Sequence, residues 1–132
     1  HINSTIDCIA SDHAPHTRAE KENPEGAPPG VPGLESTLPL MLTAVSQGRL
    51  SAARLTELLA ANPRRIFNLP EQPDTWVEVD PDEQYTFPDR PLYTKCGWSP
   101  FAGLRLSGKV TRVVLRGQEV VRDGIVLNYQ NP

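Results

Sequence analysis

The sequence predicts an α/β fold in which a strand and several helices precede antiparallel β-structure. A short apolar run at residues 6–10 (Ile-Asp-Cys-Ile-Ala) is typical of a buried strand. Apolar residues recur at helical spacing between residues 34 and 67, and from residue 75 onward they alternate with period two. We therefore expect two parts, residues 1–69 and residues 70–132, which meet where the period changes.

Residues 34–47 are expected to form the first helix. Five apolar side chains recur there every three or four positions: Leu34, Leu38, Met41, Leu42 and Val45. Pro39 must lie in the first turn or mark a kink, because proline has no amide hydrogen to donate. Gly48 is a suitable end to this helix.

A second helix is expected to begin after Ser51, a residue type that caps helix N-termini. Its apolar stripe consists of Leu55, Leu58 and Leu59, which we interpret as core residues and not as cofactor contacts. Asn62 should end this helix. Pro63 fits the first position of a short third helix that runs through residue 67.

The last part of the chain is expected to be β-structure. The expected strands are residues 76–80, 85–87, 109–116, 119–122 and 125–127. Turn residues separate them at 80–82 (Asp-Pro-Asp), 117–118 (Gly-Gln) and 123–124 (Asp-Gly), the last typical of a tight hairpin. An irregular, aromatic-rich stretch is expected at residues 92–103.

Composition excludes several classes of function. The formal net charge of -3 is small, and no basic stripe indicates nucleic-acid binding. No apolar run approaches the ~20 residues that cross a bilayer. The two cysteines, Cys8 and Cys96, form no Cys-x-x-Cys pattern, and a reducing cytoplasm is the simplest setting. With 132 residues and no initiator methionine, we expect a portion of a larger fold.

The stretch with most chemistry is Ser-Asp-His-Ala-Pro-His at residues 11–16. It places Asp12, His13 and His16 directly after the expected strand, where α/β enzymes carry their reactive groups. A carboxylate and imidazoles together suit a divalent metal, a general base or an anion site. A plain surface turn is the alternative, since Asp, His and Pro are common in loops.

A long loop follows at residues 17–33. It is charged at first and then rich in proline and glycine, with Pro-Pro-Gly-Val-Pro-Gly at residues 28–33. Such a stretch has little backbone freedom outside its glycines, so it can hold main-chain groups steady against a small ligand. A plain connector is the alternative interpretation.

These motifs resemble those of dihydroorotases, members of the amidohydrolase superfamily. The resemblance rests on Asp-His-Ala-Pro-His at 12–16 and Pro-Pro-Gly-Val-Pro-Gly-Leu-Glu at 28–35. Three later stretches agree in order: Asn-Pro-Arg-Arg-Ile-Phe at 62–67, Trp-Ser-Pro-Phe at 98–101 and Val-Val-Leu-Arg-Gly at 113–117. Together they favour the branch formed by the dihydroorotase domain of multifunctional pyrimidine-synthesis proteins.

The resemblance implies the carboxyl-terminal portion of a metal-dependent TIM barrel, followed by strands of a small β-sandwich. It implies reversible cyclisation of N-carbamoyl-L-aspartate to dihydroorotate with two zinc ions. By resemblance Asp12 is both a metal ligand and the general acid/base, and His16 hydrogen-bonds the substrate carboxylate. The backbone of Pro29 and Gly30 meets the substrate. For His13, orienting Asp12 and a merely hydrogen-bonded histidine both remain open.

The sequence lacks part of the machinery that this family uses. It has no His-x-His, and a catalytic zinc takes about three protein ligands. We therefore expect the chain to be inactive alone and to need the rest of the same domain, with a homo-oligomer as the assembled form. An inactive dihydroorotase-like scaffold, or another cyclic-amide hydrolase such as an allantoinase or hydantoinase, are the alternatives. Trp98 and Phe101 are expected to be structural.

Overall fold

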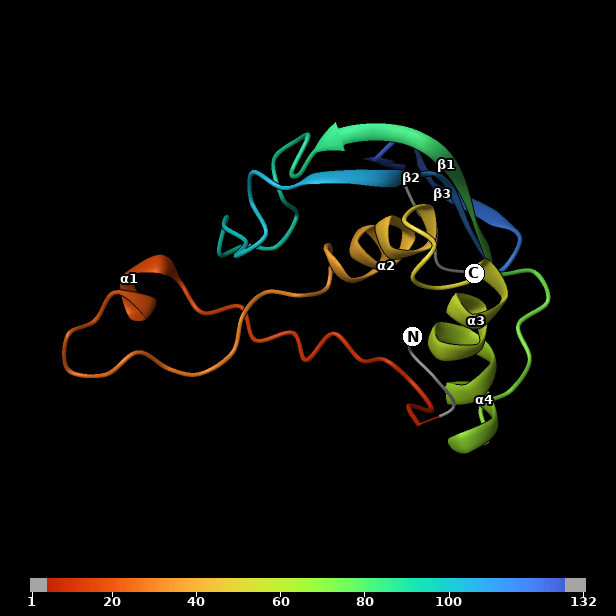
Figure 1. Ribbon diagram of the computed structural model, residues 1–132, viewed down its shortest axis with the longest axis horizontal. Coiled ribbons are helices and arrows are strands. Elements are labelled where there is room, and N and C mark those ends of the chain that lie inside the picture. Colours follow the sequence, from red (N-terminus) through yellow and green to blue (C-terminus); the bar gives the residue numbers. More distant parts are fainter. Residues whose placement is uncertain (1–4, 128–132) are drawn as a thin grey trace.

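The computed structural model describes residues 5–127 and has the expected α/β character (Figure 1). Its helices are α1 (Arg18–Lys21), α2 (Thr37–Ser46), α3 (Ala52–Thr56), the π-helical turn η1 (Glu57–Ala61) and α4 (Asn62–Ile66). Its strands are β1 (Trp76–Thr86), β2 (Arg105–Leu115), β3 (Gln118–Arg122) and β4 (Ile125–Val126). The strands form one antiparallel sheet in the order β1-β2-β3-β4. No described helix combines the length and hydropathy of a membrane span.

Helix α2 begins later than its apolar pattern predicts. Leu34 is 65% exposed and precedes the helix, because the carbonyl of Gly33 accepts hydrogen bonds from the amides of Ser36 and Thr37 in a turn. Pro39 lies in the first turn, as predicted. The predicted end is also confirmed, since Gly48 adopts φ 68° just after the helix.

The second and third predicted helices form one continuous rod. Ser51 caps it as predicted, accepting a hydrogen bond from the Arg54 amide at 3.1 Å. The prediction that Asn62 ends the helix is wrong, since Asn62 has helical angles (φ -68°, ψ -47°). Pro63 has no amide hydrogen and would crowd the carbonyl of Leu59 in a regular α-helix. The wider π-turn η1 accommodates it directly upstream.

The core lies between α2, the α3–η1 rod and the sheet. Its centre is Leu58, which is fully buried. The expectation that Leu55, Leu58 and Leu59 are core residues is confirmed, since Leu55 is also buried and Leu59 packs against the buried cluster. The buried cluster consists of Leu42, Ala44, Leu50, Leu55 and Leu58. Ile9 and Val79 pack against its edge, so the segment near the amino terminus and strand β1 both contribute to it.

Strand β1 is a single strand where the sequence predicted two with a turn between them. Asp80 pairs with Lys109 and Gln84 with Ser107, so the residues between them form a bulge. The Asp80 carboxylate accepts the amides of Asp82 and Glu83 at 2.9 and 3.2 Å. These bonds satisfy amides that a bulge withdraws from the sheet ladder, which lets the strand continue.

The turns that close the sheet use positive φ angles. Asp123 and Gly124 form the predicted hairpin turn, with φ 49° and 78°. The preceding turn lies one residue earlier than predicted, at Arg116 and Gly117 (φ 51° and 76°). Strand β3 therefore begins at Gln118.

Helix α2 packs directly on β2, beneath the sheet in Figure 1. The Thr43 hydroxyl accepts the Ser107 amide at 2.9 Å and lies 3.2 Å from the Ser107 carbonyl. Gly108 makes this approach possible, because a Cβ built there would lie 2.6 Å from Leu42 Cβ. We call residues 34–127 the packed region and residues 5–33 the motif segment.

Candidate functional site

The first part of the motif segment is extended but belongs to no sheet. The predicted strand at residues 6–10 is therefore wrong for the described chain. Three hydrogen bonds tie the stretch to the helical rod: Ile9 amide to Leu58 carbonyl (3.1 Å), Arg54 Nη2 to Ile6 carbonyl (2.6 Å) and Asn62 Nδ2 to Asp7 carbonyl (2.8 Å). A strand needs a neighbouring strand for its ladder, and no described segment provides one here.

The two motifs that carry the resemblance lie side by side. The Ala14 amide donates to the Val31 carbonyl at 3.0 Å, and His13 and Val31 form an isolated parallel bridge. A Cβ built on Gly30 would lie 2.5 Å from Ala14 Cβ. One built on Gly33 would lie 2.5 Å from the Ser11 carbonyl oxygen. The glycines thus let the two backbones touch.

Asp12 lies on the surface of the motif segment. Its backbone is left-handed (φ 44°), a conformation that aspartate tolerates better than most residues. The carboxylate is exposed, and Asp12 is absent from the lining of the two best-formed clefts among residues 5–127. The same residues contain no group of three His, Cys, Asp or Glu side chains able to hold a metal. The described residues alone therefore do not fit the expected zinc pair.

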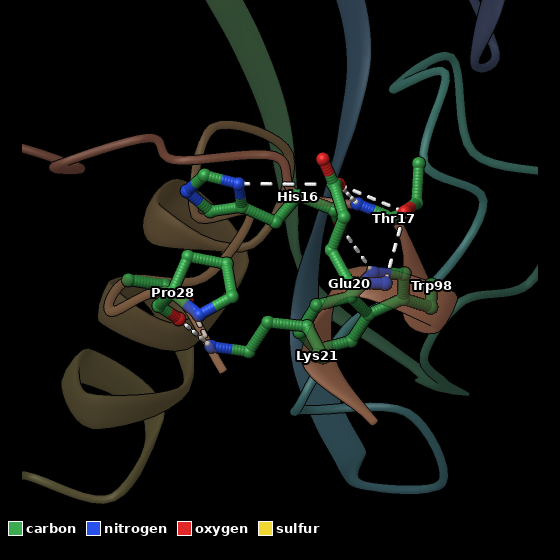
Figure 2. A network of polar contacts seen from close by, with 7 residues as sticks. His16, Thr17, Glu20, Lys21, Pro28 and Trp98 are labelled. Atoms are coloured by element: carbon green, nitrogen blue, oxygen red, sulfur yellow. Dashed lines mark hydrogen bonds and ion pairs between the residues drawn. The ribbon is translucent and has the colours of Figure 1, made fainter. Parts of the chain in front are cut away.

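The two histidines differ in their surroundings. His13 Nδ1 accepts the Leu34 amide at 3.2 Å, and His13 is half-buried, which favours its reading as a hydrogen-bonded histidine over an orienting one. The His16 side chain is 37% exposed, with Nδ1 4.0 Å from Glu20 Oε2. The His16 carbonyl accepts Trp98 Nε1 at 2.8 Å (Figure 2).

Helix α1 is a single turn fixed by a capping box. The Glu20 amide donates to Thr17 Oγ1 at 3.2 Å, and Glu20 Oε2 accepts the Thr17 amide at 2.6 Å (Figure 2). The hydrogen bonds from the Thr17 side chain and then its backbone hold the pKa of Glu20 below its ordinary value. The Thr-x-x-Glu spacing at 17–20 is the sequence signal that would have located this turn.

Lys21, the last residue of α1, was not among the predicted site residues. Its Nζ donates to the Pro28 carbonyl at 2.6 Å (Figure 2). It also donates to the Gly30 carbonyl at 3.0 Å. Lys21 and Gly30 are half-buried, whereas Pro29 between the two carbonyls is exposed. The charged residues that open the loop therefore organise its proline-rich end.

Residues 87–104 connect β1 to β2 and lie against the start of α2 and the motif segment. The Glu35 carboxylate accepts the Thr94 hydroxyl, the Thr94 amide and the Tyr93 amide at 2.7, 2.8 and 3.1 Å. Burial raises the pKa of Glu35, but these hydrogen bonds and Arg90 outweigh it and the pKa is lowered. Trp98 binds the His16 carbonyl, in keeping with its predicted structural role.

A cleft of about 290 Å³ lies between the sheet and this connection. Apolar side chains from the sheet, the connection and α2 dominate its lining, including Leu38, Phe87, Leu92, Val110 and Val113. At its polar edge Lys109 Nζ contacts Glu83 and Asp89 at 2.8 and 2.9 Å, and these hydrogen bonds raise the pKa of Lys109. None of the predicted site residues lines this cleft.

Curated proteins similar to the chain include multifunctional proteins and dihydroorotases. Multifunctional protein pyr1-3 of Dictyostelium discoideum is 57% identical over 122 residues, and multifunctional protein CAD of Squalus acanthias is 52% identical over 122 residues. Each match covers 92% of this chain and 5% of the relative. The dihydroorotase of Pyrococcus abyssi is 39% identical over 130 residues, covering 92% of this chain and 31% of that enzyme.

Solved structures similar to the chain include a dihydroorotase-like domain and a hydantoinase. The inactive dihydroorotase-like domain of the Chaetomium thermophilum CAD-like multifunctional protein is 37% identical, with a TM-score of 0.66 over 74% of this chain and 28% of that chain. The L-hydantoinase of Arthrobacter aurescens is 29% identical, with a TM-score of 0.83 over 96% of this chain and 31% of that chain. No family model matches the sequence.

Proposed function

This chain belongs to the dihydroorotase family, of whose members it spans less than a third, and from that premise we propose that it is part of the catalytic domain of a dihydroorotase. The complete protein would interconvert N-carbamoyl-L-aspartate and dihydroorotate in pyrimidine synthesis. The observation that carries this proposal is the match to archaeal dihydroorotases across 92% of the chain. This match includes the residues to which we assign the chemistry, namely Asp12, His16, Pro29 and Gly30.

Asp12 is proposed as the proton carrier. In ring opening, water attacks the ring carbonyl carbon and the carbon–nitrogen bond of the cyclic amide breaks. Asp12 takes a proton from the attacking water and passes it to the departing nitrogen, which becomes the terminal NH₂ of the carbamoyl group. The Asp12 carboxylate is exposed in this chain. It would therefore be free to act on the substrate when the rest of the domain encloses the site.

His16 and the backbone of Pro29 and Gly30 are proposed to bind the substrate. His16 can donate a hydrogen bond to the substrate carboxylate, since its side chain is partly exposed. Neither the Pro29 carbonyl nor the Gly30 amide has a hydrogen-bond partner within residues 5–127. Both groups are thus available to pair with the amide edge of the ring.

Zinc remains part of the proposal only for the complete domain. Asp12 would supply one ligand, and most of the other ligands would come from outside this chain, because the described residues do not assemble a metal group. The remainder of the same domain is therefore the first partner we propose. A homo-oligomer in the cytoplasm is the proposed setting.

An inactive scaffold is the second candidate, and one observation favours it. The solved domain from Chaetomium thermophilum, 37% identical to this chain, is described as inactive. The candidates differ in whether the complete protein turns over dihydroorotate. The hydantoinase alternative is less favoured, because identity to the L-hydantoinase is 29% against 39% for a dihydroorotase.

Replacing Asp12 by Asn in the complete protein tests the proposal. The amide keeps the size of the side chain but cannot carry the proton, so dihydroorotate turnover should fall by roughly 10³-fold or more. The matched control is Asp7→Asn, on the same segment, whose exposed side chain makes no hydrogen bond or ion pair within residues 5–127. Near-normal activity of Asp12→Asn would refute its role, and a wild-type protein without turnover would favour the scaffold.

A further inference from the structure

We propose that Lys21 is a positioning residue that sets the orientation of the Pro29–Gly30 peptide for substrate binding. The inference rests on the proposed function, because it assumes that this peptide meets the substrate. Lys21 itself touches no reacting atom. Its ammonium acts through the two backbone carbonyls that it holds, those of Pro28 and Gly30, at 2.6 and 3.0 Å.

The geometry singles out one peptide unit. The Pro28 carbonyl belongs to the peptide before Pro29, and the Gly30 carbonyl belongs to the peptide after Gly30. Lys21 thus holds the two peptides that flank the Pro29–Gly30 unit, and the ring of Pro29 fixes φ at that residue. Gly30, with φ 90°, would otherwise be the free joint of the loop.

A second set of contacts holds this backbone as well. Gly30 lies against Ala14, and the Val31 carbonyl accepts the Ala14 amide at 3.0 Å. The segment is therefore held both by the Lys21 ammonium and by the Asp-His-Ala-Pro-His motif. Neither the Pro29 carbonyl nor the Gly30 amide takes part in these contacts, and neither has a hydrogen-bond partner within residues 5–127.

The lysine is itself placed by the short helix that precedes it. The Thr17–Glu20 capping box forms the turn that ends at Lys21 (Figure 2). This arrangement orders the substrate-facing backbone before substrate arrives, so binding does not bear the cost of ordering it. A loop without the ammonium must be ordered by the substrate, which weakens binding more than it slows the chemical step.

The test uses the complete protein and compares Lys21→Met with Lys95→Met, which removes an exposed lysine outside the loop. Lys21→Met should raise KM for dihydroorotate by roughly tenfold and change kcat by less than about twofold. Lys21→Arg should recover part of the loss, because a guanidinium also donates to carbonyls. Hydrogen exchange at the Ala14 amide should be faster in Lys21→Met, since its acceptor on Val31 is no longer held.

Two results overturn the inference while leaving the proposed function intact. One is a KM of Lys21→Met equal to that of Lys95→Met in an active enzyme. The other is a fall in kcat with KM unchanged, which belongs to a group acting only in the transition state. A wild-type complete protein that does not turn over dihydroorotate refutes the proposed function itself, and the positioning role with it.

Discussion

The packed region and the motif segment are held in different ways. In the packed region, α2 and the helical rod bury leucines against a sheet whose strands pair with one another. In the motif segment, single hydrogen bonds and close glycine contacts join one extended backbone to another. The difference teaches that residues 5–127 form a core of their own but do not form the sheet in which the reactive motif is expected to lie. Stability and chemistry should therefore respond to different substitutions.

The largest effect on stability is expected from Gly108→Ala. A Cβ there would lie 2.6 Å from Leu42 Cβ, at a backbone φ of 90°. The crowding and the unfavourable φ together should cost about 2–4 kcal/mol of the free energy of unfolding. Urea denaturation of the complete protein measures this. Gly103→Ala is the matched control, since its φ is 87° but nothing lies within 4 Å, so it should lose only about 1 kcal/mol.

A smaller and local effect is expected from Gly30→Ala. Its Cβ would meet Ala14 Cβ at 2.5 Å, but both residues belong to the motif segment, so the segment can separate without opening the core. KM for dihydroorotate should rise roughly tenfold while the urea midpoint stays near wild type. Gly26→Ala is the control, because nothing lies near its Cβ. A loss of stability equal to that of Gly108→Ala would erase the distinction between the two regions.

The smallest effect is expected from Glu119 on strand β3. The hydrogen bond from Arg122 lowers the pKa of Glu119 most, burial opposes it, and the hydrogen bond from Arg112 lowers the pKa further. Together they bring the pKa of Glu119 from 4.5 to about 2. Because the folded state favours the ionised form, this contribution is present above pH 4.5 and is lost as the pH falls toward 2. The loss of stability between these pH values should be smaller in Glu119→Gln than in wild type. Its control is Glu71→Gln, an exposed residue outside the sheet, which should follow wild type in the same urea titration.

Local patterns in the sequence predicted the packed region well. The Ser51 cap, the Asp123–Gly124 turn and the burial of Leu58 all depend on neighbours a few residues away or on a simple apolar stripe. The π-turn before Pro63 was not predictable in this way, since the same residues fit either a break or a wider turn. The Asp80 bulge was missed because a turn and a bulge use the same residue types.

The motif segment was less predictable, for a physical reason. Residues 6–10 have a strand-like composition, but pairing depends on a partner that their own sequence does not specify. The resemblance implies that both motifs meet the substrate, but it does not predict that Gly30 approaches Ala14. The Lys21 contacts depend on a loop closing over seven and nine residues, which no periodicity reports. The roles of Asp12, His16, Pro29 and Gly30 remain predictions.

The left-handed backbone at Asp12 has a consequence for mutagenesis. Asparagine and glycine adopt this conformation readily, whereas β-branched residues resist it. A saturation library at residue 12 would therefore mix lost chemistry with distorted geometry in nearly every member. Asparagine removes the carboxylate without straining the backbone, so its effect reports the lost chemistry alone. Glutamate retains a carboxylate, but its activity would also be affected by a strained main chain.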